Sequence, residues 1–132
     1  MIAKAEVKYI RISPQKARLV TKALKGMPVI KAAAVLKSLN KKGASLLAKV
    51  LHSAVANAKN KGFKEDTLFI ARALANPGPT LKRYQAASFG RAGVIRKRTS
   101  HLIVELDTNE KIINTVSSAK KRGRISKPSV SK

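Results

Sequence analysis

The sequence predicts an α+β fold, with a small helical body, core strands and a long β-ribbon that extends from two of those strands. Apolar residues alternate with polar ones near the N-terminus and again after residue 67, as in half-buried strands. Between residues 14 and 60 the apolar residues recur at helical spacing instead. Residues 78–101 are too polar for a core and too regularly patterned for a linker, which favours a ribbon outside the body.

A first strand is expected over residues 3–12. Ala5, Val7 and Tyr9 would share one face of it, and Ile10 and Ile12 the other. Such alternation is typical of a strand that is buried on at least one side.

A first helix is expected from Pro14 to about Lys25. Ser13 suits the N-cap position, and proline suits the first helical position because its missing N–H would be unpaired there anyway. Gly26 would end the helix. The predicted core stripe is Ala17, Val20 and Leu24, and a separate basic face includes Arg18, Lys22 and Lys25.

Two more helices should follow. Pro28 plausibly opens a short one that runs through Leu39, and residues 40–43 form a basic turn after it. The third helix, over residues 44–60, is the most apolar and should be the spine of the core. For the second helix the expected inward face is Ile30, Ala33, Leu36 and Leu39.

Residues 67–75 and 99–107 are expected as core strands on either side of the ribbon. In the later strand Leu102, Val104 and Leu106 alternate with more polar residues, which predicts one inward face. The ribbon would then continue the sheet and inherit its register.

The ribbon itself has two basic clusters at similar distances from a flexible centre at residues 86–90. If the centre is a turn, Lys82 and Arg83 face the cluster at residues 96–98 across an antiparallel pair. Arms of about ten residues would reach on the order of 30 Å at roughly 3.3 Å per residue. A lone two-stranded ribbon is only marginally stable in water, so this one needs a partner.

Charge identifies the kind of partner. The chain has 29 Lys and Arg against 6 Asp and Glu, a formal charge of +23. No acid occurs in residues 7–64 or 67–104, whereas an ordinary soluble surface mixes both signs. A polyphosphate such as RNA is the obvious neutralising partner.

Several function classes find no support in the sequence. His52 and His101 have no acid at matching spacing, and there is no glycine-rich phosphate loop or metal-ligand cluster, so we expect no enzyme activity and no cofactor. There is no cysteine and no stretch of about 18 apolar residues. We therefore expect an intracellular protein without a membrane partner.

Three motifs in order resemble the bacterial-type family of large-subunit ribosomal protein L22, also called uL22. They are YIRISPQKARLV at residues 9–20, AKVL followed by SA and ANA at residues 48–58, and GPTLKR, GRA and KRTSH within residues 78–101. One segment departs from the family. The family's ribbon tip is commonly rich in Pro and Arg just before Gly-Arg-Ala, whereas here it reads QAASF at residues 85–89.

The resemblance implies three helices packed on a three-stranded antiparallel sheet, with the β-hairpin at about residues 79–100 threading through large-subunit (23S-type) rRNA. It implies a cytoplasmic ribosomal protein whose hairpin tip reaches the wall of the nascent-peptide exit tunnel. The expected partners are rRNA, neighbouring large-subunit proteins and, transiently, the nascent polypeptide, with no homo-oligomer. Residues 1–110 would form the single domain and residues 111–132 a basic, flexible tail.

The basic clusters and the matched motifs together give the expected site residues. The expected rRNA-binding residues are Arg11, Ser13, Lys16, Arg18, Lys22, Lys82, Arg83, Arg91, Arg96, Lys97, Arg98, Thr99, Ser100 and His101. The expected tunnel-facing tip is Gln85, Ala86, Ala87, Ser88, Phe89, Gly90 and Arg91.

An alternative reading of the same charges is a DNA-binding architectural protein of the histone-like kind, which also uses basic ribbon arms. Such a protein should form a dimer and bind duplex DNA at least as well as folded rRNA.

Overall fold

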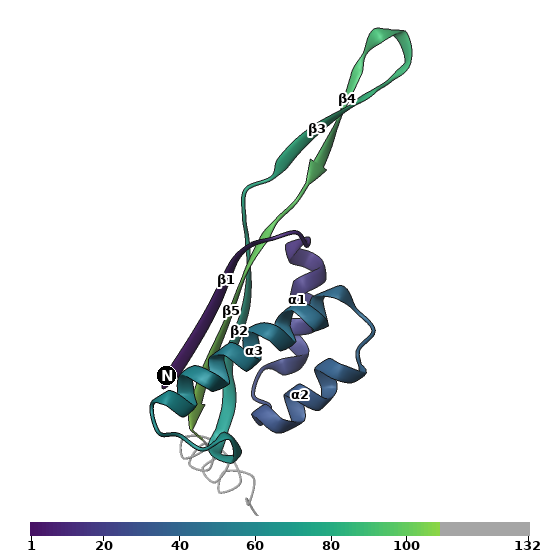
Figure 1. The fold of residues 1–132 in the computed structure, drawn as a ribbon. Helices are drawn as coiled ribbons and strands as arrows, with labels where there is room; N and C mark the ends of the chain where they lie inside the picture. The colour runs from purple at the N-terminus through teal and green to yellow at the C-terminus, as the bar shows by residue number, and fades with distance from the viewer. Residues whose placement is uncertain (109–132) are drawn as a thin grey trace, which may run out of the picture.

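The computed structural model describes residues 1–108 and confirms the α+β class (Figure 1). The expected tail at residues 111–132 lies outside the described residues. The three-stranded sheet consists of β1 (Ala3–Ile10), β5 (Ser100–Thr108) and β2 (Leu68–Pro77) in the order β1-β5-β2, and both neighbouring pairs are antiparallel. The helices α1 (Pro14–Leu24), α2 (Val29–Ser38) and α3 (Lys42–Asn60) lie on one side of it, and a short 3₁₀ turn, η1 (Glu65–Thr67), precedes β2.

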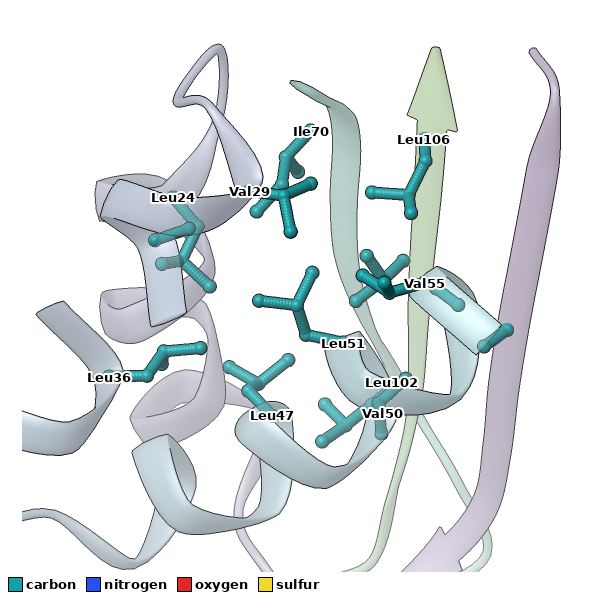
Figure 2. Close-up of a cluster of buried hydrophobic side chains, with 14 of the residues drawn as sticks. Leu24, Val29, Leu36, Leu47, Val50, Leu51, Val55, Ile70, Leu102 and Leu106 are labelled. Atoms are coloured by element: carbon teal, nitrogen blue, oxygen red, sulfur yellow. The ribbon is translucent and has the colours of Figure 1, made fainter. Parts of the chain in front are cut away.

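The core lies between the helices and the inward face of the sheet. Leu102, Val104 and Leu106 of β5 are fully buried, as their alternation predicts. Side chains from all three helices meet those of β2 and β5 in one cluster, with Leu47 and Leu51 of α3 at its centre (Figure 2). α3 is thus the spine of the core, as its apolar pattern predicts.

The expected inward face of the second helix is correct at Leu36 and at the partly buried Ala33, and wrong at Ile30 and Leu39. Val29, Ala32 and Leu36 are buried, whereas Ile30 is 54% exposed and Leu39 also faces solvent. The loop before the helix is hydrogen-bonded to β2, because the Gly26 N–H donates to Ile70 O and the Ile70 N–H donates to Met27 O, both at 2.9 Å. This attachment fixes where the helix begins and turns Val29 inward.

The first strand ends earlier than expected, because a bulge interrupts it. Its pairing with β5 shifts between Val7 and Ile10, and Tyr9 has a positive φ of 58°. Val7 before the bulge and Tyr9 within it are exposed, whereas Ala5 and Ile12 are buried. Ala5 and Ile12 were expected on opposite faces, and the one-residue shift at the bulge breaks that alternation.

The ribbon is a separate two-stranded sheet of β3 (Leu81–Ala86) and β4 (Ala92–Lys97), with a short 3₁₀ turn, η2 (Ser88–Gly90), at its tip. It extends well away from the body (Figure 1), and every residue of both strands is exposed. Lys82 pairs directly with Arg96, and Tyr84 with Val94, so the two basic clusters do face each other.

The expectation that the ribbon inherits the register of the sheet is wrong by one residue. Pro77 pairs with Ser100 and Leu81 with Lys97, so residues 78–80 on one arm face only residues 98–99 on the other. The Gly78 N–H donates to Thr99 O at 3.0 Å, and the Thr99 hydroxyl donates to Pro79 O at 2.6 Å. A one-residue bulge at this root reverses which side chains face each side of the ribbon.

We predict that Gly78→Ala destabilises the protein by about 1–3 kcal/mol. An added Cβ would lie 2.6 Å from Thr99 Oγ1 and 3.1 Å from the His101 ring, so the Thr99–Pro79 hydrogen bond would have to move. Urea unfolding followed by circular dichroism measures the change. Gly93→Ala is the matched control, because its nearest neighbour, Gln85 O, is at an ordinary 3.7 Å. Equal stability of the two variants would contradict this account of the root.

Candidate nucleic-acid interface

A basic groove of about 700 Å³ opens where the ribbon leaves the body. Three segments that are far apart in the sequence meet there: residues 11–20 at the start of α1, residues 41–43 at the start of α3, and residues 96–98 at the end of β4. Its seven cationic residues are Arg11, Lys16, Lys41, Lys42, Arg96, Lys97 and Arg98. We call this surface the basic groove.

A close contact between α1 and α3 builds the floor of the groove. Gly43, in the first turn of α3, is buried, and a Cβ there would lie 3.3 Å from Ile12 Cδ1 and 3.5 Å from Val20 Cγ2. The absence of a side chain lets the start of α3 approach the start of α1. Lys41 and Lys42 are thereby held opposite the ribbon root.

Both helices present their N-terminal ends to the groove. Neither α1 nor α3 has an acidic residue in its first turn, and neither N-cap side chain, Ser13 or Lys41, makes a capping hydrogen bond. The first N–H groups and the positive end of the helix dipole favour an anion at such an end. The backbone thus adds to the attraction that the seven cations exert on phosphate.

No acid reduces this positive charge. None of the five acids within residues 1–108 lines the groove. The ion pairs found in this part of the chain join Asp107 to the N-terminus, Glu6 to Lys4 and Glu65 to Lys59, and none involves a groove cation. The groove cations are therefore placed for an external anion.

The ribbon extends this charged surface away from the body. Lys82, Arg83 and Arg91 are exposed, and Lys82 lies directly across from Arg96. Like charges at opposite positions of a strand pair destabilise it unless a counter-charge lies between them. A phosphate bound along the ribbon would supply that counter-charge.

The expected basic face of the first helix does not act as one unit. Arg18 Nε donates to Ala75 O at 3.1 Å, which joins α1 to β2. Lys22 is exposed in the last turn of the helix. Neither lines the basic groove, in contrast to Arg11, Ser13 and Lys16.

Thr99, Ser100 and His101 belong to the base of the ribbon and not to the groove lining. The Thr99 hydroxyl donates a hydrogen bond to Pro79 O. Ser100 Oγ is buried and has no hydrogen-bond partner among the described residues. His101 Nδ1 accepts the Tyr9 N–H at 3.0 Å, and the two rings meet edge to face at 4.9 Å. The sequence placed these three among the phosphate contacts, and this stays a prediction. In the structure Thr99 also supports the ribbon root and His101 the bulge of β1.

Lys41 and Lys42 are the residues that the sequence reasoning missed. Residues 40–43 have the composition of an ordinary basic turn, but Lys42 is already the first residue of α3. One feature of the sequence could have indicated them: two lysines and a glycine stand at the start of the most apolar helix. Their approach to Arg96–Arg98 depends on tertiary packing, which no local pattern reveals.

Other kinds of site find no support in residues 1–108. They contain no group of three or more His, Cys, Asp or Glu side chains that could hold a metal ion. None of the helices described is long and apolar enough to cross a membrane. His52 is exposed on α3 and does not line the basic groove.

Comparison with known proteins identifies the family of this chain. A family model described as Ribosomal protein L22p/L17e matches residues 5–107. A protein of Solidesulfovibrio magneticus named Large ribosomal subunit protein uL22 is 52% identical over 110 residues, which are 83% of this chain and 100% of the relative. Proteins of the same name from Halothermothrix orenii (45% identical, 79% of this chain and 93% of the relative) and Mycoplasmopsis agalactiae (51%, 80% and 93%) also match.

We predict that replacing Lys41 and Lys42 together with Ala weakens binding to a folded RNA transcript. Each lost phosphate contact should reduce the slope of log affinity against log salt by about 0.7–0.9, so the double variant should lose up to about 2. Filter binding across a salt series measures this slope.

The matched control is the double variant Lys31→Ala and Lys37→Ala, which removes the same charge from exposed positions on α2. An equal loss of slope in both double variants would mean that overall charge, and not the basic groove, determines binding.

Proposed function

The chain belongs to the family described as Ribosomal protein L22p/L17e, and we propose that it binds and organises large-subunit rRNA through the basic groove and the ribbon. Membership makes it a ribosomal protein with a structural and non-enzymatic role in translation, located with the ribosome in the cytoplasm. Its relatives are named as large-subunit proteins, and we therefore place this chain in the large ribosomal subunit.

The observation that supports rRNA binding most strongly is the composition of the basic groove. Seven cations from three separate segments, together with two helix N-terminal ends, surround one hollow that no carboxylate of residues 1–108 lines. Arginine can grip a phosphate with two parallel hydrogen bonds, and the groove has Arg11, Arg96 and Arg98. A sugar–phosphate backbone that enters the groove would be held between the body and the ribbon.

The mechanism we propose is neutralisation of charge combined with insertion of the ribbon. The phosphates bound in the groove fix the body, and the exposed arms then lie between RNA segments that would otherwise repel each other. Lys82, Arg83 and Arg91 supply the contacts along the arms. Thr99, Ser100 and His101 remain proposed rRNA contacts, and Thr99 and His101 also pack against the bulged root.

The finer parts of the assignment are proposals as well. We propose that the ribbon tip, residues 85–91, lies at the wall of the peptide exit tunnel; the family resemblance and its position at the far end of the ribbon support this. Neighbouring large-subunit proteins and the passing nascent chain would be further partners. We also propose residues 1–110 as a single domain that acts without forming a homo-oligomer.

We predict that the triple variant Arg96→Ala, Lys97→Ala and Arg98→Ala binds large-subunit rRNA more weakly and with a salt slope lower by about 2–3. These residues belong to both the groove and the ribbon root, so their loss removes the contacts that join the two parts. Filter binding with transcribed large-subunit rRNA, over a salt series, measures the effect.

Lys31→Ala, Lys37→Ala and Lys64→Ala together form the matched control, since all three lysines are exposed outside the groove. Unchanged affinity and slope in the Arg96–Arg98 variant would overturn the proposal. A duplex DNA of similar length serves as competitor, because preference for that duplex over folded rRNA would favour the architectural DNA-binding alternative.

A further inference from the structure

The tip of the ribbon displays one aromatic side chain that the proposed rRNA contacts do not use. Phe89 is 98% exposed, more than any other large apolar residue within residues 1–108. Its neighbours Ala87, Ser88 and Gly90 are too small to cover a ring, and η2 contains no buried residue. Nothing in the described structure shields this ring from water.

The backbone at Phe89 is unusual for an aromatic residue. Its φ of 56° and ψ of 38° lie in the left-handed region, and Gly90 follows with a φ of 67°. Two successive positive φ values are the pattern of a type I′ turn, whose first central position favours Asn, Asp or Gly. The turn is closed by hydrogen bonds from the Ala87 N–H to Arg91 O at 2.8 Å and from the Arg91 N–H to Ser88 O at 3.4 Å.

Phe89 therefore stands at a position where both the solvent exposure and the backbone conformation are unfavourable for an aromatic residue. Such violations of local preference are expected where a residue serves a partner. A flat ring beside cations suits a nucleic acid, because a base can stack on the ring while its phosphates pair with the charges. Along the ribbon the nearest cation is Arg91, followed by Arg83 and the Lys82–Arg96 pair, and no acid occurs between residues 67 and 104.

We propose that Phe89 is a base-stacking site, which takes the face of one unpaired base of large-subunit rRNA. This inference rests on the proposed function. The basic groove binds phosphates of the rRNA, and Phe89 would in addition bind one of its bases. The ring stacks on any base, since every base has a π face. A passing polypeptide is the other conceivable occupant, and the experiment separates the two.

The first test uses Phe89→Trp as a reporter. The chain contains no tryptophan, so residue 89 then provides the only tryptophan fluorescence of this protein. Subunits reconstituted with the wild-type chain give the signal of the other subunit proteins, which is subtracted. In large subunits reconstituted without any nascent chain, stacking should quench this fluorescence and lower its access to acrylamide several-fold relative to the free protein. Ile30→Trp, an exposed position on α2, is the matched control for general burial by RNA.

Two results would overturn the proposal. One is equal acrylamide access of the tryptophan at position 89 in the free protein and in the peptide-free subunits. The other is shielding that occurs only when a polypeptide fills the tunnel, which would assign the ring to the nascent chain.

The second test separates the ring from the turn. Phe89→Asn suits the left-handed position, so its thermal midpoint should be unchanged or higher, while its affinity for large-subunit rRNA should fall about tenfold. Phe89→Tyr should bind like the wild type, and Phe89→Leu, which has no π face, should bind like Phe89→Asn. Wild-type affinity in both the Asn and the Leu variants would contradict stacking.

Failure of this inference is distinguishable from failure of the proposed function. No cation changes in these variants, so their salt slopes should equal that of the wild type. If the wild-type protein itself showed no salt-dependent binding to large-subunit rRNA, that result would contradict the proposed function as a whole. Loss of the Phe89 effect alone would contradict only the stacking role.

Discussion

The antiparallel pairing of β2 with β5 is the interaction on which the rest of the structure depends. β5 is the central strand, and its buried residues Leu102, Val104 and Leu106 form the floor on which the helices pack. The same pair leads directly into the ribbon through the Gly78–Thr99 hydrogen bond. Core and ribbon are therefore coupled, and the direction of the ribbon is set by the strands that close the core.

The bulge at the ribbon root shows how this coupling serves the site. An extra residue on the outgoing arm shifts the register, and the side chains of Thr99 and His101 lie against this root. With the root in this form, Arg96–Arg98 line the basic groove together with the starts of α1 and α3.

Local patterns in the sequence predicted the element types well, because alternation and helical spacing report directly on burial. They predicted the facing basic clusters too, since a hairpin centred on residues 86–90 leaves little choice of pairing. They failed to predict which face is buried where contacts distant in the sequence determine it. The hydrogen bonds to Ile70 set the buried face of α2, and a bulge at Tyr9 turned the end of β1 outward. The basic groove was beyond such patterns, since Lys41 and Lys42 meet the ribbon only through the close contact at Gly43.

The most direct measurement of the central claim is a cryo-electron microscopy map of large ribosomal subunits that contain this chain. The account predicts rRNA phosphates in the basic groove, within about 4 Å of cations from both the body, at Lys41 or Lys42, and the ribbon, at Arg96–Arg98. A groove that opens to solvent, or one that is filled by a neighbouring protein while the RNA passes elsewhere, would contradict it.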